Sequence, residues 1–496
     1  MDQLRGVRRQ IQYPMENEPP ARRPRIGGIN VGIGQQQANV PANAAALPLF
    51  STLRRATVIL PNLRNGALDQ FFDKGDVANA AASERRSALS VVLQSLVDHS
   101  PNIESLSEFA MFKSITNNHI LELVKFRHLK SIDFSGCPLK ALDLAEFLIT
   151  SDSRGQIEEL RLDRSFRLPS TVTDAMWERR GDNDQYLRQA FASIPYRPSL
   201  KLNKLSYAGN DALPGVFLCS LDASDLEELS VAGSDLVPEY VAGLLDRADH
   251  LINLNLNEFE SVPMFNSLGT IRSPNLKSVH LNWPRNRRIV QPFTNEDFAS
   301  ALADLGRRCT QMKSLFLTTN FYCSDVVVDA IANNFPALTC LRLDVETCGS
   351  HTLFHLVTRL RRLEILGLYT CGPYPTEVDA VVLGAIATNQ RRLKELTLCR
   401  PYISPPVALQ LLLELPDLKK LFVSGECVNN DTLIGWCQNF GYRLEWLEIP
   451  NTRRVSDASL TVAANYLTNI RRLNLRNCEI TDARSPLRAR FWRNWM

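Results

Sequence analysis

The stretch Ile470 to Cys478 reads Ile-Arg-Arg-Leu-Asn-Leu-Arg-Asn-Cys and decides the fold. Its frame, Leu-x-x-Leu-x-Leu, has apolar residues at the first, fourth and sixth positions. The frame recurs mostly at steps of 24 to 28 residues, and its thirteen copies begin at Leu129, Ile157, Leu202, Leu226, Leu251, Leu276, Met312, Leu338, Leu363, Leu393, Leu418, Leu444 and Ile470. Chance does not fill all three positions of every copy in a chain that is 45% hydrophobic. The chain is therefore a tandem repeat.

A repeat of this length, with Cys, Asn or Ser after the frame, is typical of leucine-rich repeats. In a short strand, side chains alternate, so the fourth and sixth positions point inward while the third, fifth and seventh point onto the sheet surface. The rest of each repeat is long enough for a helix of two or three turns that returns the chain. In the last repeat, Ser456 or Asp457 is the expected helix cap. The sequence predicts an α/β leucine-rich-repeat solenoid, a horseshoe with a parallel concave sheet and convex helices.

Composition restricts the partners and the compartment. The net charge is +3, from 56 basic and 53 acidic residues, which is too balanced to argue for a nucleic-acid partner on global charge, so local patches are judged separately. The eleven cysteines contain no C-x-x-C pair and are typical of reduced thiols in an intracellular protein. We see no signal peptide and no apolar run that could span a membrane, and expect a soluble cytoplasmic protein. The cluster from Pro20 to Arg25 resembles a nuclear-import signal, although such clusters are common in unstructured tails.

The chain divides into four expected regions. Residues 1–45 are rich in Pro, Arg, Gln, Gly and Asn and are expected to form a disordered basic tail. Residues 46–100 are expected to form an N-terminal cap of a strand and a helix over the open end of the solenoid. Residues 101–482 are the solenoid. Residues 483–496 contain Phe491, Trp492 and Trp495 among arginines, and we interpret them as a C-terminal cap or tail, with a partner motif or membrane-surface anchor as the alternatives.

Two repeats are too long. The step from Ile157 to Leu202 is 45 residues, with an extra helix predicted near Asp184 to Ala192, and the step from Leu276 to Met312 is 36 residues. Both insertions follow a strand end, so both should project from one rim, where repeat proteins often bind partners; the alternative is a tolerated surface loop. Their basic side chains suggest RNA or phosphate binding through a basic rim formed by Arg285, Arg287 and Arg288, together with Arg164, Arg167, Arg179 and Arg180.

Catalytic chemistry is not indicated. His351 and His355 have a spacing that can hold a metal, but residue 352 is Thr where a zinc protease of that pattern has Glu. The sequence has no Gly-x-Ser-x-Gly elbow, Walker loop or Cys/His cluster. We therefore expect no enzyme activity, no metal and no cofactor.

The repeats resemble the ribonuclease-inhibitor-like branch of leucine-rich-repeat proteins, and within it the cysteine-containing repeats of the F-box family. The resemblance covers residues 101–482 and is clearest at Leu129 to Cys137, Leu-Lys-Ser-Ile-Asp-Phe-Ser-Gly-Cys, and at Ile470 to Cys478 with the Ile-Thr-Asp that starts at Ile480. It implies a curved interaction scaffold, and many members are substrate receptors of cullin-type ubiquitin ligases. The chain departs from the family at the F-box, because Leu47-Pro48 is not followed by the expected helical pattern and the first tryptophan is Trp177.

The outward strand positions predict the binding surface. They are polar in the first half of the chain, as in the ladder Asn253, Asn255 and Asn257. In the second half they include Phe316, Ile365, Tyr369, Phe422 and Trp446, and exposed aromatic clusters are the usual anchors of protein interfaces. We therefore predict a non-catalytic scaffold that binds a protein partner on its concave face. The alternatives are a subunit that recognises substrates for a cullin ligase, with the ligase adaptor as partner, and a role of these aromatics as a dock for the C-terminal tail.

Overall fold

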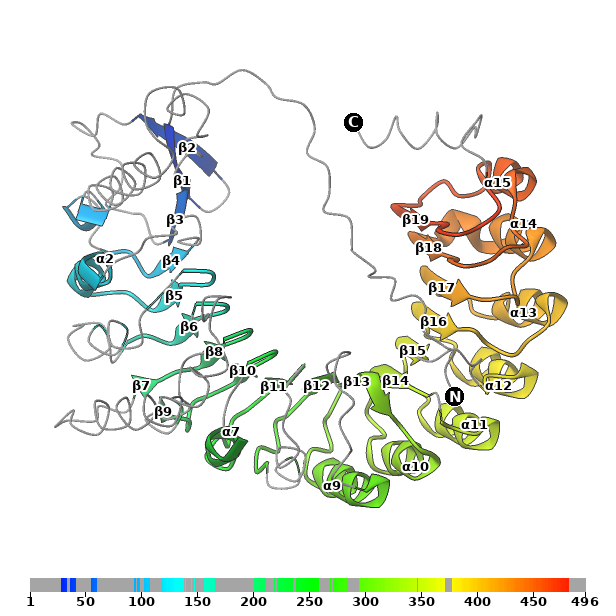
Figure 1. The fold of residues 1–496 in the computed structure, drawn as a ribbon, viewed down its shortest axis with the longest axis horizontal. Coiled ribbons are helices and arrows are strands. Elements are labelled where there is room, and N and C mark those ends of the chain that lie inside the picture. The colour runs from blue at the N-terminus through cyan, green and yellow to red at the C-terminus, as the bar shows by residue number, and fades with distance from the viewer. Residues whose placement is uncertain are drawn as a thin grey trace, which may run out of the picture.

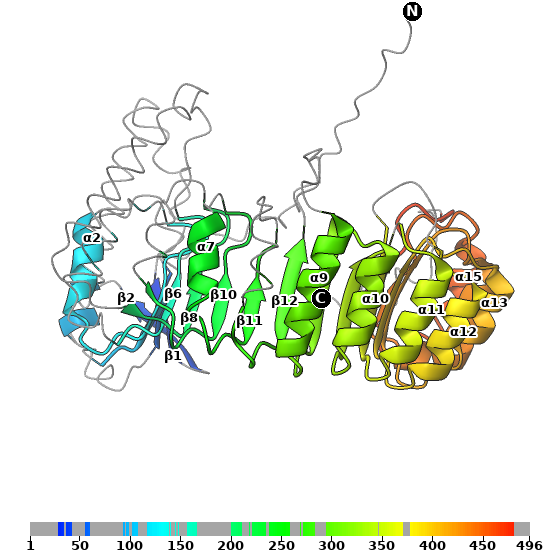
Figure 2. The ribbon, with the colours of Figure 1, turned by 90° about the horizontal axis from the view of Figure 1, so that it is seen from below.

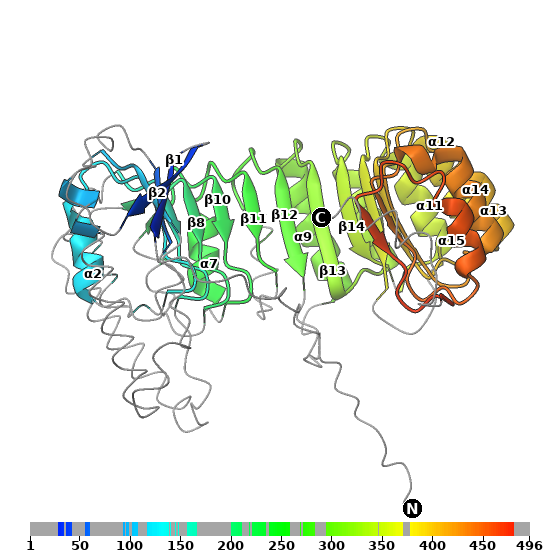
Figure 3. The same cartoon turned by 90° about the horizontal axis from the view of Figure 1, so that it is seen from above.

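The computed structural model describes residues 28–33, 36–41 and 55–59 and then, with gaps, residues 93–480; the longest gaps are 108–116, 148–155, 166–199, 211–217, 258–267 and 283–293. The described chain forms an open horseshoe, with strands on the inner wall and helices on the outer wall (Figure 1). Helices α7 and α9 to α13 lie in front of the sheet when the molecule is seen from below, with β10 to β12 visible between α7 and α9 (Figure 2), and strands β10 to β14 face the viewer from above (Figure 3). This is the predicted leucine-rich-repeat solenoid.

One parallel sheet runs the length of the horseshoe, because each repeat contributes a strand that pairs with those of the repeats before and after it. The strands in their order across the sheet are β3 (Arg55–Ile59), β4 (Ser105–Ser107), β5 (Ser131–Asp133), β6 (Glu159–Arg161), β8 (Lys204–Ser206), β10 (Glu228–Ser230), β11 (Asn253–Asn255), β12 (Ser278–Asn282), β13 (Ser314–Tyr322), β14 (Cys340–Asp344), β15 (Ile365–Tyr369), β16 (Glu395–Cys399), β17 (Lys420–Ser424), β18 (Trp446–Glu448) and β19 (Arg472–Asn474). A separate short pair joins β7 (Leu200–Lys201) to β9 (Leu221–Asp222).

Helices form the convex wall, and each of α9 to α15 packs against the next. The described helices are α2 (Asn117–Glu122), η4 (Leu123–Lys125), α7 (Pro238–Leu245), α9 (Asn295–Arg308), α10 (Asp325–Asn334), α11 (Ser350–Arg359), α12 (Ala380–Asn389), α13 (Pro405–Leu412), α14 (Asn430–Phe440), η5 (Gly441–Arg443) and α15 (Asp457–Ala463). Ser456 is the N-cap of α15, but its side chain makes no cap bond and instead hydrogen-bonds with Asn430 of α14. The predicted position is right, and the expected capping bond is absent.

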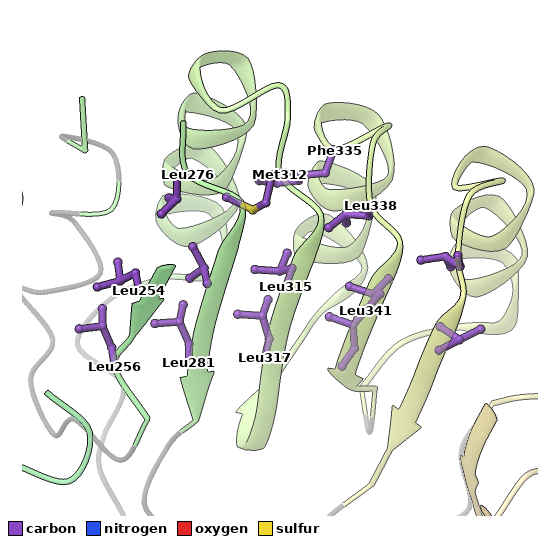
Figure 4. Packing of buried hydrophobic residues seen from close by; sticks show 14 of the residues in the cluster. Leu254, Leu256, Leu276, Leu281, Met312, Leu315, Leu317, Phe335, Leu338 and Leu341 are labelled. Atoms are coloured by element: carbon purple, nitrogen blue, oxygen red, sulfur yellow. The ribbon is translucent and has the colours of Figure 1, made fainter. Parts of the chain in front are cut away.

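The core lies between the sheet and the helices, and the repeat frame supplies it. The first, fourth and sixth positions are buried in the twelve copies that begin at Leu129 through Leu444. Met312, Leu315 and Leu317, for example, lie between the strands and the convex helices (Figure 4). In the copy that begins at Ile470, the residues at these positions are only partly buried. Each repeat thus stabilises its neighbours, as expected for a quasi-one-dimensional array.

A left-handed turn ends many strands at the eighth position of the frame. The eight described residues with positive φ all occupy this position: Gly136, Arg164, Gly209, Gly233, Arg400, Gly425, Asn451 and Asn477. Gly and Asn adopt this conformation at little cost, whereas arginine does not. The turn directs the chain away from the sheet toward the next helix.

The ninth position of the frame explains why Cys, Asn and Ser recur there. Ser165 donates to the carbonyl of Phe134 at 2.7 Å, and the side-chain amide of Asn210 donates to that of Leu162 at 2.8 Å. In both cases the acceptor is the sixth position of the preceding repeat, whose carbonyl is buried. Such bonds join consecutive repeats, and a buried carbonyl without a partner would be costly.

The two long repeat steps are insertions, because the strands around them are direct neighbours. Leu160 of β6 pairs in register with Leu205 of β8, and Val279 of β12 pairs with Leu315 of β13. The predicted helix near residues 184–192 lies outside the described residues.

Part of the first 45 residues is described. The structure places two antiparallel strands there, β1 (Gly28–Ile33) and β2 (Gln36–Pro41), and β1 also pairs with β3. In β1, Ile29, Val31 and Ile33 alternate with Gly and Asn, the period of a strand. The division of the chain into tail, cap, solenoid and C-terminal region stays a prediction.

Candidate functional site

The five side chains predicted to bind a partner lie at outward positions of the sheet. Phe316 comes from β13, Ile365 and Tyr369 from β15, Phe422 from β17 and Trp446 from β18. All five are half-buried, whereas the inward residues between them on the same strands are buried. Strand alternation therefore orients them onto the concave wall that Figure 1 shows.

Phe316 lies between an imidazole and a guanidinium. Its ring centroid is 4.0 Å from that of His280 on β12, with an interplanar angle of 42°. On the other side, the guanidinium carbon of Arg342 on β14 lies 5.2 Å from the centroid, within cation–π range. Burial, and then the charge of Arg342, lower the pKa of His280. The neutral imidazole is therefore the form that this cluster stabilises.

Gly367 makes room for Arg342 and Tyr369 above the sheet. A Cβ at Gly367 would lie 2.6 Å from Cε2 of Tyr369 and 3.1 Å from Cγ of Arg342. The side chain of Arg342 extends across Gly367 on β15 and forms an ion pair with Glu395 on β16. Burial is the main cause that raises the pKa of Tyr369, so its hydroxyl stays neutral. The glycine is needed here for the close approach of two large side chains.

Trp446 is held on several sides. Its indole Nε1 donates to Oε1 of Glu448 at 2.6 Å, and the guanidinium of Arg472 lies 4.3 Å from its ring. The Lys420 ammonium lies 5.5 Å from the same ring. Glu448 is only 6% exposed and also accepts from Arg472 at 2.9 Å and from Asn474 at 3.2 Å. The indole is thus fixed before any partner arrives.

One ion pair joins the two clusters. Lys420 Nζ lies 3.3 Å from Oε2 of Glu395, which also pairs with Arg342. The result is a continuous row of contacts from β12 to β19, called here the aromatic–charged row: His280, Phe316, Arg342, Glu395, Lys420, Trp446, Arg472 and Glu448. Phe422 and Ile365 lie beside it, because Phe422 pairs in register with Glu448 and Ile365 with Glu395.

Sequence reasoning found Phe316 and Trp446 and missed the other six members of this row, most of which are charged. Arg342, Glu395, Lys420 and Arg472 occupy third or fifth positions of their repeats, so the same frame that found Phe316 marks them as outward. The outward positions of the second half are therefore not only aromatic and apolar. The sequence signal that could have identified them is the presence of acidic, basic and aromatic residues at the third and fifth positions of successive repeats.

The first half of the concave wall holds a groove of about 400 Å³. Glutamate, lysine, serine and asparagine side chains from β6 to β12 line it, and Lys204 pairs with Glu228 at 3.1 Å. Asn253 and Asn255 of the predicted ladder are among its lining residues.

The predicted basic rim is largely outside the described residues. Arg285, Arg287 and Arg288 lie in the gap 283–293, and Arg167, Arg179 and Arg180 lie in the gap 166–199. Arg164 is described, exposed, and has a left-handed backbone with φ of 56°. The C-terminal aromatics Phe491, Trp492 and Trp495 also lie outside the described residues, so the tail dock stays a hypothesis.

One of the two histidines with metal-binding spacing contacts a carboxylate on the neighbouring helix. His355 on α11 lies 3.0 Å from Asp329 on α10. The described part of the chain contains no group of three or more His, Cys, Asp or Glu side chains that could hold a metal ion. Burial raises the pKa of Cys309 to about 11 and of Cys427 to about 12, so these thiols are poor nucleophiles at neutral pH. None of the described helices is long and apolar enough to cross a membrane.

By its fold the chain is a leucine-rich-repeat solenoid. No protein-family model and no curated protein matches it. It is similar to the solved structure of an internalin from Listeria monocytogenes, with a TM-score of 0.42 and 15% identity over 80% of this chain and 89% of that one. It is also similar to Rad7 in the yeast Rad7–Elc1 complex, with a TM-score of 0.46 and 16% identity over 80% of this chain and 95% of that one. For the TLR13–ssRNA13 complex, the TM-score is 0.38 and the identity is 16% over 77% of this chain and 54% of that one. At these identities the likeness concerns the fold alone.

Proposed function

We propose that the protein is a non-catalytic scaffold that binds a protein partner on the concave face of β12 to β19. The aromatic–charged row is the observation that carries this proposal. Interfaces are enriched in Trp, Tyr, Phe and Arg, and a few such residues supply most of the binding free energy. Here they lie in a row across adjacent strands, on a wall whose inward residues are buried and fixed.

The row is preorganised, which lowers the cost of binding. Trp446 is oriented by Glu448 and Arg472, and Phe316 by His280 and Arg342. Side chains that are ordered in the free protein lose little conformational entropy when a partner covers them. Because the row contains charges of both signs, a partner with a complementary pattern of charges and apolar anchors fits it best.

A matched pair of double variants tests the surface. Phe422→Ala with Trp446→Ala should lower partner recovery roughly thirty-fold or more, since truncation of one interface anchor costs about 2 kcal/mol or more. Phe354→Ala with Tyr466→Ala removes aromatic side chains that are exposed outside the concave strands, and should leave recovery unchanged. The measurement is quantitative mass spectrometry of affinity-purified complexes.

Melting temperatures distinguish a loss of partner binding from a loss of folding. Both double variants should melt close to the wild type, because none of the four residues lies at an inward framework position. Equal recovery in the two double variants would contradict the concave site. Unfolding of the Phe422/Trp446 variant alone would assign these residues to structural packing instead.

A finer proposal, recognition of substrates for a cullin-type ubiquitin ligase, is supported by the resemblance of the repeats to those of F-box proteins. The same purification tests it, since a ligase subunit should recover a cullin and its adaptor in stoichiometric amounts. Consistent absence of both would rule out this role and leave the scaffold proposal intact.

A further inference from the structure

A second candidate site lies at the rim of the sheet where strands β16 to β19 end. The turns after these strands line a cavity of about 1000 Å³. Three arginines contribute to its wall: Arg400 after β16, and Arg453 and Arg454 after β18. It is separate from the aromatic–charged row, none of whose members lines it.

The charge of the cavity is positive. Among the described lining residues, Glu426 is the only acid, and it pairs with Arg454, whose Nε lies 3.2 Å from Oε2. Three cations therefore face one anion. The start of α13 adds little, because Pro405 and Pro406 carry no N–H group to donate. The positive potential comes from the arginine side chains.

The backbone of Arg400 is unusual for its residue type. It occupies the eighth position of the frame with φ of 48°, where Gly425, Asn451 and Asn477 fill the corresponding positions of the next three repeats. Gly or Asn would satisfy the turn at lower cost than arginine. An arginine kept in a costly backbone conformation at the edge of a cavity is a reason to look for a function.

The walls also offer apolar contact. Tyr402 is 74% exposed and lines the cavity together with Pro401 and Ile403. Guanidinium groups bind carboxylate and phosphate oxygens through paired hydrogen bonds. We propose that this cavity binds an anionic segment of a protein, one that carries phosphate or carboxylate groups next to an apolar side chain. The proposal does not depend on the function assigned to the concave row.

The geometry favours a peptide over a nucleic acid. Backbone recognition of RNA needs an extended basic stripe with aromatic platforms. Here the arginines surround one local cavity, a glutamate lies among them, and Tyr402 is the one aromatic side chain among the described lining residues.

Peptide binding to the full chain provides the test. Fluorescently labelled Gly/Ser peptides with one leucine would carry two phosphoserines, two glutamates or no charge, and a uridine oligonucleotide of similar length would be the fourth probe. Fluorescence anisotropy should show binding of the charged peptides and not of the neutral one. A preference for phosphoserine or for glutamate identifies the source of the anion.

Three variants locate the site. Arg453→Ala with Arg454→Ala should weaken peptide binding about tenfold or more, as expected for lost hydrogen bonds between charged groups. Arg272→Ala with Arg307→Ala removes two exposed cations elsewhere and should have no effect. Glu426→Gln should strengthen binding several-fold, because it releases Arg454 and removes the one acid.

Arg400 separates a binding role from a structural one. Arg400→Gly should weaken peptide binding while the melting temperature stays the same or rises, since glycine relieves the left-handed conformation. Arg164→Gly is the matched control, because Arg164 occupies the same position of an earlier repeat with φ of 56°. It should show the same melting behaviour and unchanged peptide affinity.

Several results would overturn the proposal. If neither charged peptide binds the protein, the proposal is wrong. Equal losses in the Arg453/Arg454 and Arg272/Arg307 variants would reduce it to general charge attraction. Tighter binding of the oligonucleotide, abolished by the Arg453/Arg454 variant, would make the cavity a nucleic-acid site.

Discussion

The concave faces of β4 to β11 and of β12 to β19 share one frame but differ in chemistry. The first carries serines, asparagines and exposed ion pairs such as Lys204–Glu228, whose side chains are 42% and 44% exposed. The second carries the aromatic–charged row, in which Glu448 is buried and Trp446 is held by several neighbours. Several strands also lengthen, from three residues in β10 and β11 to five in β14 to β17.

This difference shows which positions specify the fold and which are free to carry function. Leu229 of the first half and Leu366 of the second occupy the same inward position and are equally buried. The outward residues that follow them, Ser230 and Gly367, differ in side chain: one has a hydroxyl group and the other has no side chain. The outward positions can therefore change along the chain without changing the stacking of repeats.

The largest expected effect tests whether the two halves are equally well packed. Leu366→Ala and Leu229→Ala should each lower the free energy of unfolding by about 2 to 5 kcal/mol, because each leaves a cavity in a closed core. Denaturant titration followed by circular dichroism measures both. A loss in only one half would show that the frame is not equally important along the horseshoe.

A smaller effect distinguishes the buried network from exposed ion pairs. Glu448→Gln should cost about 1 to 3 kcal/mol, because the amide places a donor against donors from Trp446, Arg472 or Asn474. Glu228→Gln, its counterpart at an exposed pair, should cost about 0 to 1 kcal/mol. The same titrations measure both, and equal costs would mean that the row is no better ordered than the first half.

The smallest expected effect is the pH dependence of stability that arises from His280, at one end of the aromatic–charged row. The pKa of His280 is lowered from 6.5 in the folded state, so between the two values the unfolded chain binds more protons. Stability should therefore fall as pH drops below about 6.5, and the full loss is reached below the folded pKa. His280→Gln should show a smaller fall in melting temperature between neutral pH and about pH 5. An identical fall would assign the pH dependence to other groups.

The fold was readable from the sequence because one frame repeats thirteen times and strand alternation fixes which residues face inward. The positions of Phe316 and Trp446 on the sheet surface followed from the same rule. The contacts of these side chains could not be predicted by that rule. Arg342, for example, reaches Glu395 two strands away only because Gly367 leaves space between them. The rim cavity was also missed, because its arginines lie in turns, where no periodicity marks them.

The partly buried last described repeat has a dynamic consequence. Among the described residues β19 pairs on one side only, with β18, and Leu473 and Leu475 are incompletely covered. Local opening therefore needs less free energy at this end than in the middle of the array, and amide hydrogens of β19 should exchange faster than those of β15. Because Arg472 of β19 lies over the ring of Trp446, each opening event uncovers one face of the indole. Fraying of β19, the last described strand, thus sets how often Arg472 leaves this face of the indole.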